Sequence, residues 1–404
     1  MNILIITQYY WPENFKINTL AQEFTKNGHK VTVLTGIPNY PTGKFFPGYS
    51  FFNNKIEYKD EIKIIRSKVI RRYNSKGYNL FLNYFSFALF SSLKIFFLKK
   101  EYDAIFVYQP SPITVGIPAL IAKYCFKIPI FFWVQDLWPQ SLTDAGGVKN
   151  KLILKIAEKL TQLIYKHSDI ILIQSEGFRE YIRNQGVKNE KIHFLPNPTE
   201  KFYKIEQIRK LYKDKFKIGF NIIFAGNIGE AQDFENIISA ADIVKSYNQK
   251  VYWNIFGDGR FKKYYENKVI ELGLQENFFF KGSVESTEMP YYFACADVLL
   301  VSLKESKIFN LTIPAKLQSY LACGKPIIGS ILGNGAKIIL DSNSGFTSMP
   351  GNPNELSKIV LKMANLETSI RNKFGDNARS YYEKHFDSDL LYNKLESLMK
   401  SNLY

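Results

Sequence analysis

The residues with the clearest chemical potential lie in the segment 311–326, LTIPAKLQSYLACGKP. Pro314 suits the first turn of a helix and Gly324 suits its end, so the segment predicts a short helix that follows an apolar strand. The free N–H groups and the dipole of such a helix start attract a diphosphate, and Lys316 would add a full positive charge. The alternative is an ordinary lysine in solvent.

Two glycine-containing turns follow consecutive strands that we expect in the second half of the chain. They are Gly226–Asn227–Ile228–Gly229 and Gly257–Asp258–Gly259–Arg260. Glycine there allows backbone N–H groups to approach a phosphate closely. Each turn alone occurs in many α/β proteins, but two in neighbouring loops favour a nucleotide. Gly282 and Val284, after the next strand, would line the nucleoside pocket together with residues 258–260.

In the first half, polar residues follow the apolar run IPIFFWV. The carboxylate of Asp136 can bond vicinal sugar hydroxyls and the indole of Trp138 can cover an apolar pyranose face, with Gln135 beside them. A purely structural Asp–Trp turn is the alternative. Glu13 and Asn14 lie near the start of the first helix, where they either cap it or face a cleft and contact a sugar or the acceptor. This loop lacks the GxGxxG pattern, which argues against dinucleotide binding.

Metal and cofactor chemistry find little support in the sequence. Cys125, Cys295 and Cys323 have neither metal-ligand nor redox spacing, and a reducing compartment fits them best. None of the four histidines follows the IFFWV strand, so none is assigned a catalytic role. The N-terminus MNILIITQYY has no basic region before its apolar run and predicts a first strand rather than a signal peptide.

An α/β scaffold must position these candidates, because β-branched runs alternate with amphipathic helical stretches. This pattern predicts two Rossmann-like, doubly wound domains, whose ligands bind beyond the carboxyl ends of the strands. A linker near LPNPTE would separate a domain over 1–198 from one over 199–385, and a terminal helix over 386–404 can pack back on the first. The expected strands are 2–7, 31–35, 62–66, 103–108, 128–134, 169–174, 221–226, 251–257, 277–282, 296–303 and 325–330.

The positive charge of the chain is concentrated in its first half. The net charge is +16, and residues 51–100 alone contain 11 basic and 3 acidic side chains. Nucleic acid, an anionic membrane surface or an anionic substrate would each explain such an excess. The sequence carries no helix-turn-helix, zinc-finger or aromatic RNA-binding signature, so nucleic acid is not expected as a partner.

The segment 81–98, FLNYFSFALFSSLKIFFL, is apolar around most of a helix, with a thin polar stripe that includes Asn83 and Ser86. Basic residues flank it, with Arg71 and Arg72 before it and Lys99 and Lys100 after it. Three interpretations remain open: a buried core helix, a helix in the membrane interface, and a membrane span. The basic flanks suit anionic headgroups.

Motifs along nearly the whole chain together resemble glycosyltransferase family 4. They are NGHKVTVLT, VQDLWP, DIILIQSEGFREYI, LPNPTE, FAGNIG, FGDGR, FKGSVESTEMPYYFACADVLLVSL and YLACGKPIIG. The resemblance implies the GT-B fold, with an interdomain cleft between an acceptor-binding, membrane-associated N-terminal domain and a nucleotide-sugar-binding C-terminal domain. It also implies retaining transfer in which the leaving diphosphate helps to deprotonate the acceptor, so that no cofactor is required.

A closer likeness is carried by QYYWPENFKIN, LTGIPNYPTGK, VQDLWPQSL and TIPAKLQSYLACGKP. These segments resemble the WbuB-like N-acetylfucosamine transferases of O-antigen and capsule biosynthesis. That branch implies transfer of a deoxy-amino sugar from UDP to an undecaprenyl-diphosphate-linked saccharide, at the cytoplasmic face of the membrane and without a metal. Asp136 and Lys316 are the catalytic candidates, and Thr312, Pro314 and Ser319 are substrate-binding candidates.

The chain departs from the broad family at several positions. Leu311 and Ser319 stand where the family has two glutamates, of which the second holds the donor ribose. Asn227 and Asp233 stand where it has an arginine and a lysine on the donor diphosphate, and Gln135 replaces a histidine. Two other functions therefore stay open: a UDP-sugar 2-epimerase of the same fold, and a non-catalytic glycosyltransferase-like subunit.

The sequence Asp387–Ser388–Asp389 resembles the DxD motif of metal-dependent glycosyltransferases. It lies directly before the terminal helix, where Asp and Ser are common N-cap residues. We therefore expect a helix cap at this position and no metal site.

Overall fold

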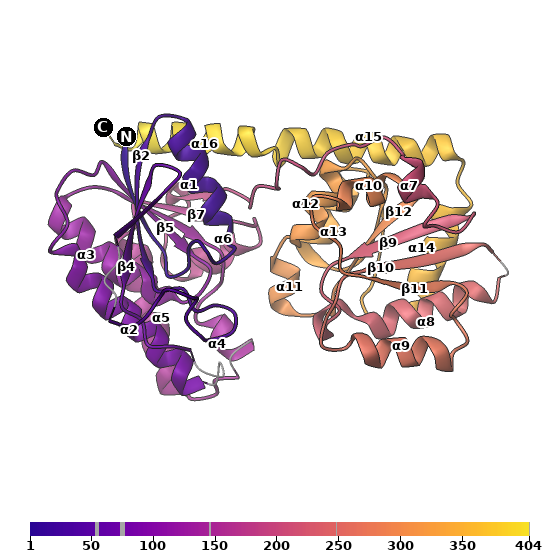
Figure 1. Cartoon of the computed structure of the whole chain (residues 1–404), viewed down its shortest axis with the longest axis horizontal. Coiled ribbons are helices and arrows are strands. Elements are labelled where there is room, and N and C mark those ends of the chain that lie inside the picture. Colours follow the sequence, from indigo (N-terminus) through magenta and orange to yellow (C-terminus); the bar gives the residue numbers. More distant parts are fainter. Residues whose placement is uncertain (53–55, 73–76, 145–146, 248, 404) are drawn as a thin grey trace. The chain divides into compact units, whose positions relative to one another are not determined.

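The computed structural model describes residues 1–52, 56–72, 77–144, 147–247 and 249–403 (Figure 1). The chain forms two compact units. The first unit is Met1–Pro196 together with Tyr392–Tyr404, and the second is Asn197–Leu391. The division falls inside the LPNPTE segment, in which two prolines interrupt the regular structure.

The first unit is built on a sheet in the order β3-β4-β2-β1-β5-β6-β7-β8. Neighbouring strands are parallel, except that β3 pairs antiparallel with β4. Because β1 pairs with β2 on one side and β5 on the other, the strand order reverses at β1 and β5. The strands are β1 (Asn2–Ile6), β2 (Lys30–Gly36), β3 (Ile56–Lys59), β4 (Ile62–Ser67), β5 (Ala104–Gln109), β6 (Ile130–Val134), β7 (Ile170–Ile173) and β8 (Ile192–Phe194).

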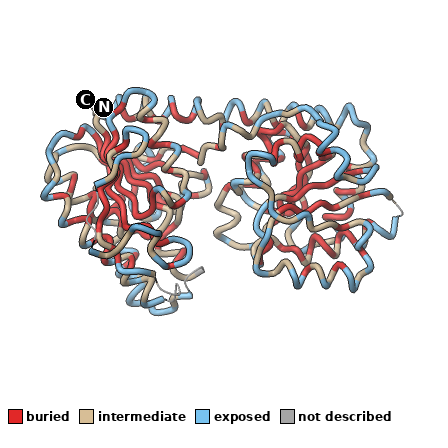
Figure 2. Tube along the Cα trace, viewed as in Figure 1, coloured by how far each residue is buried: buried red, intermediate tan, exposed pale blue. Residues whose placement is uncertain are grey.

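Helices connect these strands and cover the sheet, as parallel pairing requires. All five residues of β6 are buried, and the indole N–H of Trp133 donates to the carbonyl of Leu195 at 2.9 Å. The buried strands form the red interior of the unit in Figure 2. The helices are α1 (Lys16–Lys26), α2 (Gly77–Ile95), α3 (Gly116–Phe126), α4 (Gln140–Asp144), α5 (Lys151–His167) and α6 (Phe178–Asn184), with a 3₁₀ turn η2 (Ile113–Val115) before α3.

The end of the chain returns to the first unit. In α16 (Ser388–Ser401), the ring of Tyr392 lies 5.4 Å from that of Phe24 in α1. The Nε2 atom of His29 lies 2.7 Å from Oε1 of Glu396. Burial of the His29 ring lowers the pKa of this side chain, so the contact is mainly a hydrogen bond near neutral pH. Figure 1 shows this part of α16 beside α1.

The second unit contains a parallel sheet in the order β11-β10-β9-β12-β13-β14. Here the strand order reverses between β9 and β12. The strands are β9 (Phe220–Ala225), β10 (Val251–Phe256), β11 (Phe278–Gly282), β12 (Val298–Ser302), β13 (Ile327–Ser330) and β14 (Gly345–Ser348). The helices are α7 (Lys210–Lys213), α8 (Phe234–Lys245), α9 (Lys262–Glu271), α10 (Met289–Ala294), α11 (Lys307–Leu311), α12 (Ala315–Ala322), α13 (Gly333–Asp341), α14 (Pro353–Ala364) and α15 (Thr368–His385).

The prediction of two doubly wound α/β domains is confirmed, and each of the eleven expected strands overlaps an observed one. The sequence does not predict β3, β8 and β14, which are short and lie at or beside sheet edges. The turn from β3 to β4 uses Asp60 and Glu61 at φ of 50° and 65°. A hairpin is usually indicated by Gly or Asn at such positions, so this hairpin could not be predicted from the sequence.

The apolar segment predicted at 81–98 forms most of α2. Among the described residues, no helix is both long and apolar enough to cross a bilayer. The polar stripe faces inward, because Asn83 and Ser86 are buried, whereas Phe81 and Phe85 are exposed. One face of the helix, with Phe87 and Ile95, is therefore part of the core, and the opposite face is not.

Candidate functional site

The carboxyl-terminal edge of the second sheet brings together two of the predicted turns. The N–H of Gly226 donates to the carbonyl of Phe256 at 2.9 Å, and that of Ile228 donates to Asp258 at 2.8 Å. A Cβ on Gly257 would lie 1.9 Å from the carbonyl oxygen of Gly226. No side chain fits between backbones that close, so glycine is required here. The two turns form one continuous backbone surface beside the point where the strand order reverses.

Lys316 lies in the first turn of α12 and reaches under this surface. Its Nζ atom lies 3.7 Å from the ring centroid of Phe224, and a Cβ on Gly226 would lie 3.0 Å from it. The Nζ is buried, and among the described residues no acceptor lies within hydrogen-bonding distance. Burial lowers the pKa of Lys316 to about 7. The amine is therefore neither solvated nor fully charged at neutral pH, which differs from both interpretations of the sequence.

Tyr320 is a site residue that the sequence analysis missed. It lies one helical turn after Lys316 and is fully buried, and its hydroxyl accepts from the N–H of Ala225 at 2.9 Å. Residues four apart share a helix face, so the pair could have been found from the orientation of Lys316. The pair attaches α12 to the end of β9 immediately before the Gly226 turn.

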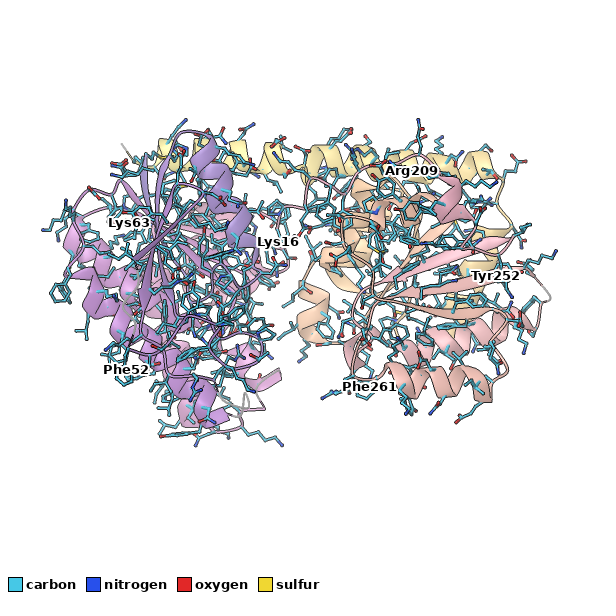
Figure 3. The ribbon with its side chains drawn as sticks, viewed as in Figure 1. Lys16, Phe52, Lys63, Arg209, Tyr252 and Phe261 are labelled. Carbon is cyan, nitrogen blue, oxygen red and sulfur yellow. The ribbon has the colours of Figure 1, made fainter. Side chains whose placement is uncertain are left out.

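Other predicted residues around this edge have local roles or are open to solvent. The carboxylate of Asp258 accepts from the N–H of Gly259 at 2.8 Å, and the guanidinium of Arg260 lies 4.9 Å from the ring of Phe261, labelled in Figure 3. A hollow of about 760 Å³ is lined by these residues, α9 and the edge strand β11. Gly282 and Val284 are half-buried and do not line it.

The remaining candidates of the second unit flank α12 and the first glycine turn. The hydroxyl of Thr312 donates to the carbonyl of Phe309 at 3.0 Å, and Pro314 is the N-cap residue of α12 rather than its first helical residue. Ser319 is half-buried, with its hydroxyl 3.5 Å from the carbonyl of Ala315. Asn227 is exposed and Gly229 is buried.

The first unit carries its predicted residues at the reversal point of its own sheet. Asp136 follows β6 and accepts a short hydrogen bond from the hydroxyl of Ser141. Burial raises the pKa of Asp136 to about 6, and hydrogen bonds from Ser141 and Ser111 oppose this shift. Trp138 is buried, with its ring centroid 6.4 Å from that of Tyr84, so its indole forms part of a wall rather than an open sugar platform.

Glu13 connects two loops of the first unit. Its carboxylate accepts from the backbone N–H groups of Asn39 at 2.8 Å, Tyr40 at 2.7 Å and Tyr10 at 3.3 Å. It is buried, which raises its pKa to about 7 in spite of these bonds. The carboxylate neither caps α1 nor faces solvent, whereas Asn14 is exposed.

The predicted Gln135 joins two loops at the same edge through its backbone. Its N–H donates to the carbonyl of Gln109 at 3.0 Å, and its carbonyl accepts from Nε2 of Gln174 at 3.2 Å. It therefore connects the ends of β5, β6 and β7.

The acidic residues near the terminal helix serve as a cap and an ion pair. The carboxylate of Asp387 accepts from the N–H groups of Asp389 and Leu390, both at 3.0 Å. Asp389 lies 2.6 Å from the amine of Lys201. Within the described residues, no cluster of three or more His, Cys, Asp or Glu side chains could hold a metal ion.

Comparisons with known proteins match both halves of the chain. Residues 203–381 match the family model described as glycosyl transferases group 1, and residues 16–198 match a glycosyl transferase 4-like domain. An uncharacterized glycosyltransferase of Methanocaldococcus jannaschii is 23% identical, over 96% of this chain and 95% of that protein. A putative colanic acid biosynthesis glycosyl transferase of Escherichia coli is 24% identical, over 80% and 82% of the two chains.

Among solved structures, Anabaena HepE in complex with UDP aligns with a TM-score of 0.71. The alignment covers 99% of this chain and 100% of that chain at 14% sequence identity. A likeness at this level identifies the fold and says nothing about the reaction.

Proposed function

We propose that this chain, whose two halves match glycosyltransferase models and whose fold is GT-B, transfers a deoxy-amino sugar from UDP to a lipid-linked saccharide. N-acetylfucosamine is the donor sugar that the WbuB-like resemblance favours, and an undecaprenyl-diphosphate-linked saccharide is the acceptor. The observation that carries the proposal is the buried amine of Lys316, which has no acceptor among the described residues and lies against the Gly226 turn.

A bound diphosphate would supply the missing acceptor. A negative charge close to the Nζ favours the protonated amine, so the pKa of Lys316 would rise from about 7 when the donor binds. The charged amine then stabilises the departing diphosphate. Backbone N–H groups of the turns assist it, apart from those of Gly226 and Ile228, which donate to carbonyls within the protein. The bond between the anomeric carbon and UDP breaks, the acceptor hydroxyl bonds to that carbon from the same face, and its proton passes to the departing diphosphate.

Two of the similar proteins favour the UDP part of this proposal and its place in biosynthesis. The HepE structure contains UDP, and the E. coli relative is named for colanic acid biosynthesis. Asp136 would orient the acceptor hydroxyls, because a carboxylate with a raised pKa at a strand end can both accept and donate hydrogen bonds near neutral pH. We assign polysaccharide assembly, as for capsule or O-antigen, as the process.

The second part of the proposal is that the first unit docks on the cytoplasmic face of an anionic membrane. Helix α2 differs from an ordinary surface helix of a water-soluble domain. Its inward face combines the apolar side chains of Phe87, Ala88 and Ile95 with the polar ones of Asn83, Ser86, Ser91 and Ser92. Its outward face is large and apolar. The exposed side chains are Tyr78, Phe81, Phe85, Leu89 and Leu93, followed by Phe96 and Phe97 just beyond the helix. We call these residues the α2 apolar face.

Charge favours lipid over a protein partner for this face. Helix α2 contains no acidic residue, and exposed Lys99 and Lys100 follow it. Helix α5, which like α2 contacts α3 and η2, exposes Leu152, Ile153 and Ile156 with lysines on the adjoining positions. Apolar side chains bordered by lysines suit the interface of a bilayer with anionic headgroups.

Product analysis tests the reaction. The purified protein is incubated with a panel of UDP-sugars and a bacterial membrane lipid extract, and products are identified by mass spectrometry and anomeric NMR. We expect a lipid-linked product that retains the donor configuration. Free epimerised sugar formed without acceptor would support the epimerase instead. Donor binding with neither transfer nor hydrolysis would support the non-catalytic subunit.

Vesicle sedimentation tests the membrane part. The protein should bind phosphatidylglycerol vesicles and leave them as salt rises, because headgroup attraction is screened. Replacement of Phe81, Phe85 and Leu89 by Ser should weaken binding by about tenfold or more. The matched control is Ile218→Ser, at an exposed apolar side chain of the second unit. Equal binding by the α2 variant and the control would contradict membrane docking by this face.

A further inference from the structure

Two segments singled out in the sequence, QYYWPENFKIN and LTGIPNYPTGK, meet at a cluster of three aromatic rings in the first unit. The ring centroids of Tyr9 and Phe15 are 5.1 Å apart, those of Tyr9 and Tyr40 are 5.5 Å apart, and those of Phe15 and Tyr40 are 5.3 Å apart. Neither the donor site nor the membrane face uses these rings. We call them the aromatic platform.

Arg72 lies over this platform. Its guanidinium carbon is 5.0 Å from the centroid of Tyr40 and 6.0 Å from that of Tyr9, and its Nη1 donates to the Tyr9 hydroxyl at 3.1 Å. The loop between β2 and β3 fixes the backbone below, because a Cβ on Gly43 would lie 2.9 Å from the carbonyl oxygen of Arg72. Gly43 has φ of +76°, which permits this close approach. The guanidinium is therefore held in place with no ion-pair partner in the part of the chain that the structure describes.

Half-buried Arg72 differs in this respect from the buried Arg66 nearby. Arg66 pairs with Glu57 at 3.1 Å and also donates to the carbonyls of Gly36 and Trp11. Arg72 makes no salt bridge with a described residue, and its Nε is buried without an acceptor. Buried charged donors are nearly always satisfied in native proteins, so a missing acceptor points to an anion outside the polypeptide.

The position of Arg72 is that of a ligand site. Tyr9 follows β1, whose end lies at the point where the strand order reverses. The hydroxyls of Tyr9 and Tyr84 interact, Tyr84 interacts with Ser111, and Ser111 reaches Asp136. A row of interacting polar side chains thus lies between the guanidinium and the carboxylate that we assign to the acceptor sugar.

We infer that Arg72 and the aromatic platform bind the diphosphate of the acceptor lipid. This inference rests on the proposed function, and it adds the group that distinguishes a lipid-linked acceptor from a free saccharide. The Nε and Nη atoms of arginine form a fork that matches two oxygens of a phosphate. The aromatic rings exclude water from one side of the guanidinium, which strengthens the charged hydrogen bonds. Asp136 would then contact the sugar attached to the diphosphate.

Binding of soluble probes to the full-length protein tests the inference. Farnesyl diphosphate is the probe, and farnesol, inorganic pyrophosphate and phosphatidylglycerol vesicles without prenyl diphosphate are compared with it by calorimetry. Arg72→Gln should weaken farnesyl diphosphate binding roughly ten- to a hundred-fold, as expected for loss of charged hydrogen bonds. The matched control is Arg71→Gln, an exposed neighbour, which should change it less than about twofold. Arg72→Lys, which keeps the charge but not the fork, should lie between.

The other probes identify the source of the anion. Farnesol binding should be the same in all variants, and the vesicles should bind Arg72→Gln as well as wild type. An effect confined to vesicles would mean that a phospholipid headgroup occupies the site, which overturns the assignment to the acceptor. An equal loss for farnesol and farnesyl diphosphate would mean that Arg72 only supports the fold, and unchanged binding of farnesyl diphosphate also overturns the inference.

These outcomes are separable from failure of the proposed function. Suppose that the wild-type protein transfers no sugar, but Arg72→Gln still weakens farnesyl diphosphate binding. The proposed reaction is then wrong, and the proposed diphosphate site is supported. If transfer to the lipid-linked acceptor occurs and is equally efficient in Arg72→Gln, the reaction stands and the diphosphate site is wrong. Unchanged UDP affinity of the variants verifies that the second unit is intact.

Discussion

The carboxyl-terminal edges of the two sheets are lined by different chemical groups. In the second unit the edge is mainly backbone, with two glycine turns in direct contact and one lysine amine below them. In the first unit it is mainly side chains, with Asp136, Trp138, Tyr9 and Arg72 above the strand ends. Both edges lie where the strand order reverses, so the same topology presents two kinds of surface.

This difference suits the two sheets of one fold to different ligands. A diphosphate is common to all UDP-sugar donors, and backbone N–H groups can recognise it without regard to the sugar. Acceptors differ in sugar and carrier, and side chains can change without disturbing the sheet.

The largest effect is expected from a side chain placed between the two turns. Gly257→Ala places a Cβ 1.9 Å from the Gly226 carbonyl oxygen, so the turns must separate. We expect loss of UDP binding and destabilisation by roughly 3 kcal/mol, measured by calorimetry and urea unfolding. Gly282→Ala is the control, because its φ is +76° but its Cβ would meet nothing within 4 Å, and it should cost about 1–2 kcal/mol. Equal stability of both variants would argue against the tight turn contact.

Removal of the amine should have the next largest effect. Lys316→Ala should reduce turnover by about ten- to a hundred-fold, since charge-assisted hydrogen bonds to the leaving diphosphate are lost. Turnover should fall more than donor affinity, because the charge on the leaving group grows towards the transition state. Ser319→Ala should mainly weaken donor binding. Near-normal steady-state kinetics of a folded Lys316→Ala variant would show that the backbone alone holds the diphosphate.

The pH dependence of donor binding should report the same amine. The pKa of Lys316 is about 7 in the free protein and rises on binding, so binding takes up a proton above that pH. Affinity for a UDP-sugar should fall by up to about tenfold per pH unit above 7, measured by calorimetry in buffers of different ionisation enthalpy. Lys316→Met should abolish this dependence. A wild-type affinity that stays flat between pH 7 and 9 would rule out coupling to this group.

A smaller effect is expected on stability. The pKa of Lys316 is about 7 when folded against 10.5 for the free side chain, so the unfolded state binds more protons between these values. Stability from this group therefore rises as pH increases from 7 to 10.5. Lys316→Met should stabilise the protein by about 1 kcal/mol at pH 7 and by less at pH 9.5, measured by thermal unfolding. Destabilisation at pH 7 would mean that the amine has an unrecognised partner.

Chelation should have no effect. Activity is expected to survive EDTA, because charge neutralisation is assigned to Lys316 and to backbone N–H groups. Asp387 and Asp389 are already engaged with the helix start and with Lys201. Loss of transfer on chelation, restored by magnesium or manganese, would overturn this assignment. The second sheet edge would then no longer differ from the first by relying on backbone groups.

The sequence alone was sufficient to predict the class of the fold and to select candidate loops at the carboxyl ends of its strands. Runs such as IFFWV are apolar on both faces and must lie in a covered sheet, and alternation with amphipathic helices leaves few other arrangements. Since ligands of such sheets bind at the carboxyl ends, Gly226, Gly257, Asp136 and Lys316 could be chosen from position alone. The glycine turns could be predicted because they depend on residues that are adjacent in the sequence.

The charge and the burial of the side chains, by contrast, follow from the tertiary structure. Burial of the Lys316 amine depends on Phe224, which is 92 positions away in the numbering, and on the closeness of Gly226. The carboxylate of Glu13 is bonded by N–H groups from a different loop, and the orientation of Asn83 towards the sheet makes the apolar face of α2 point outward. Arg66 and Arg72 lie six positions apart with similar neighbours, yet one is paired and the other is not. The residues that folding brings together set the charge and the exposure of each side chain. The local sequence does not show which residues these are.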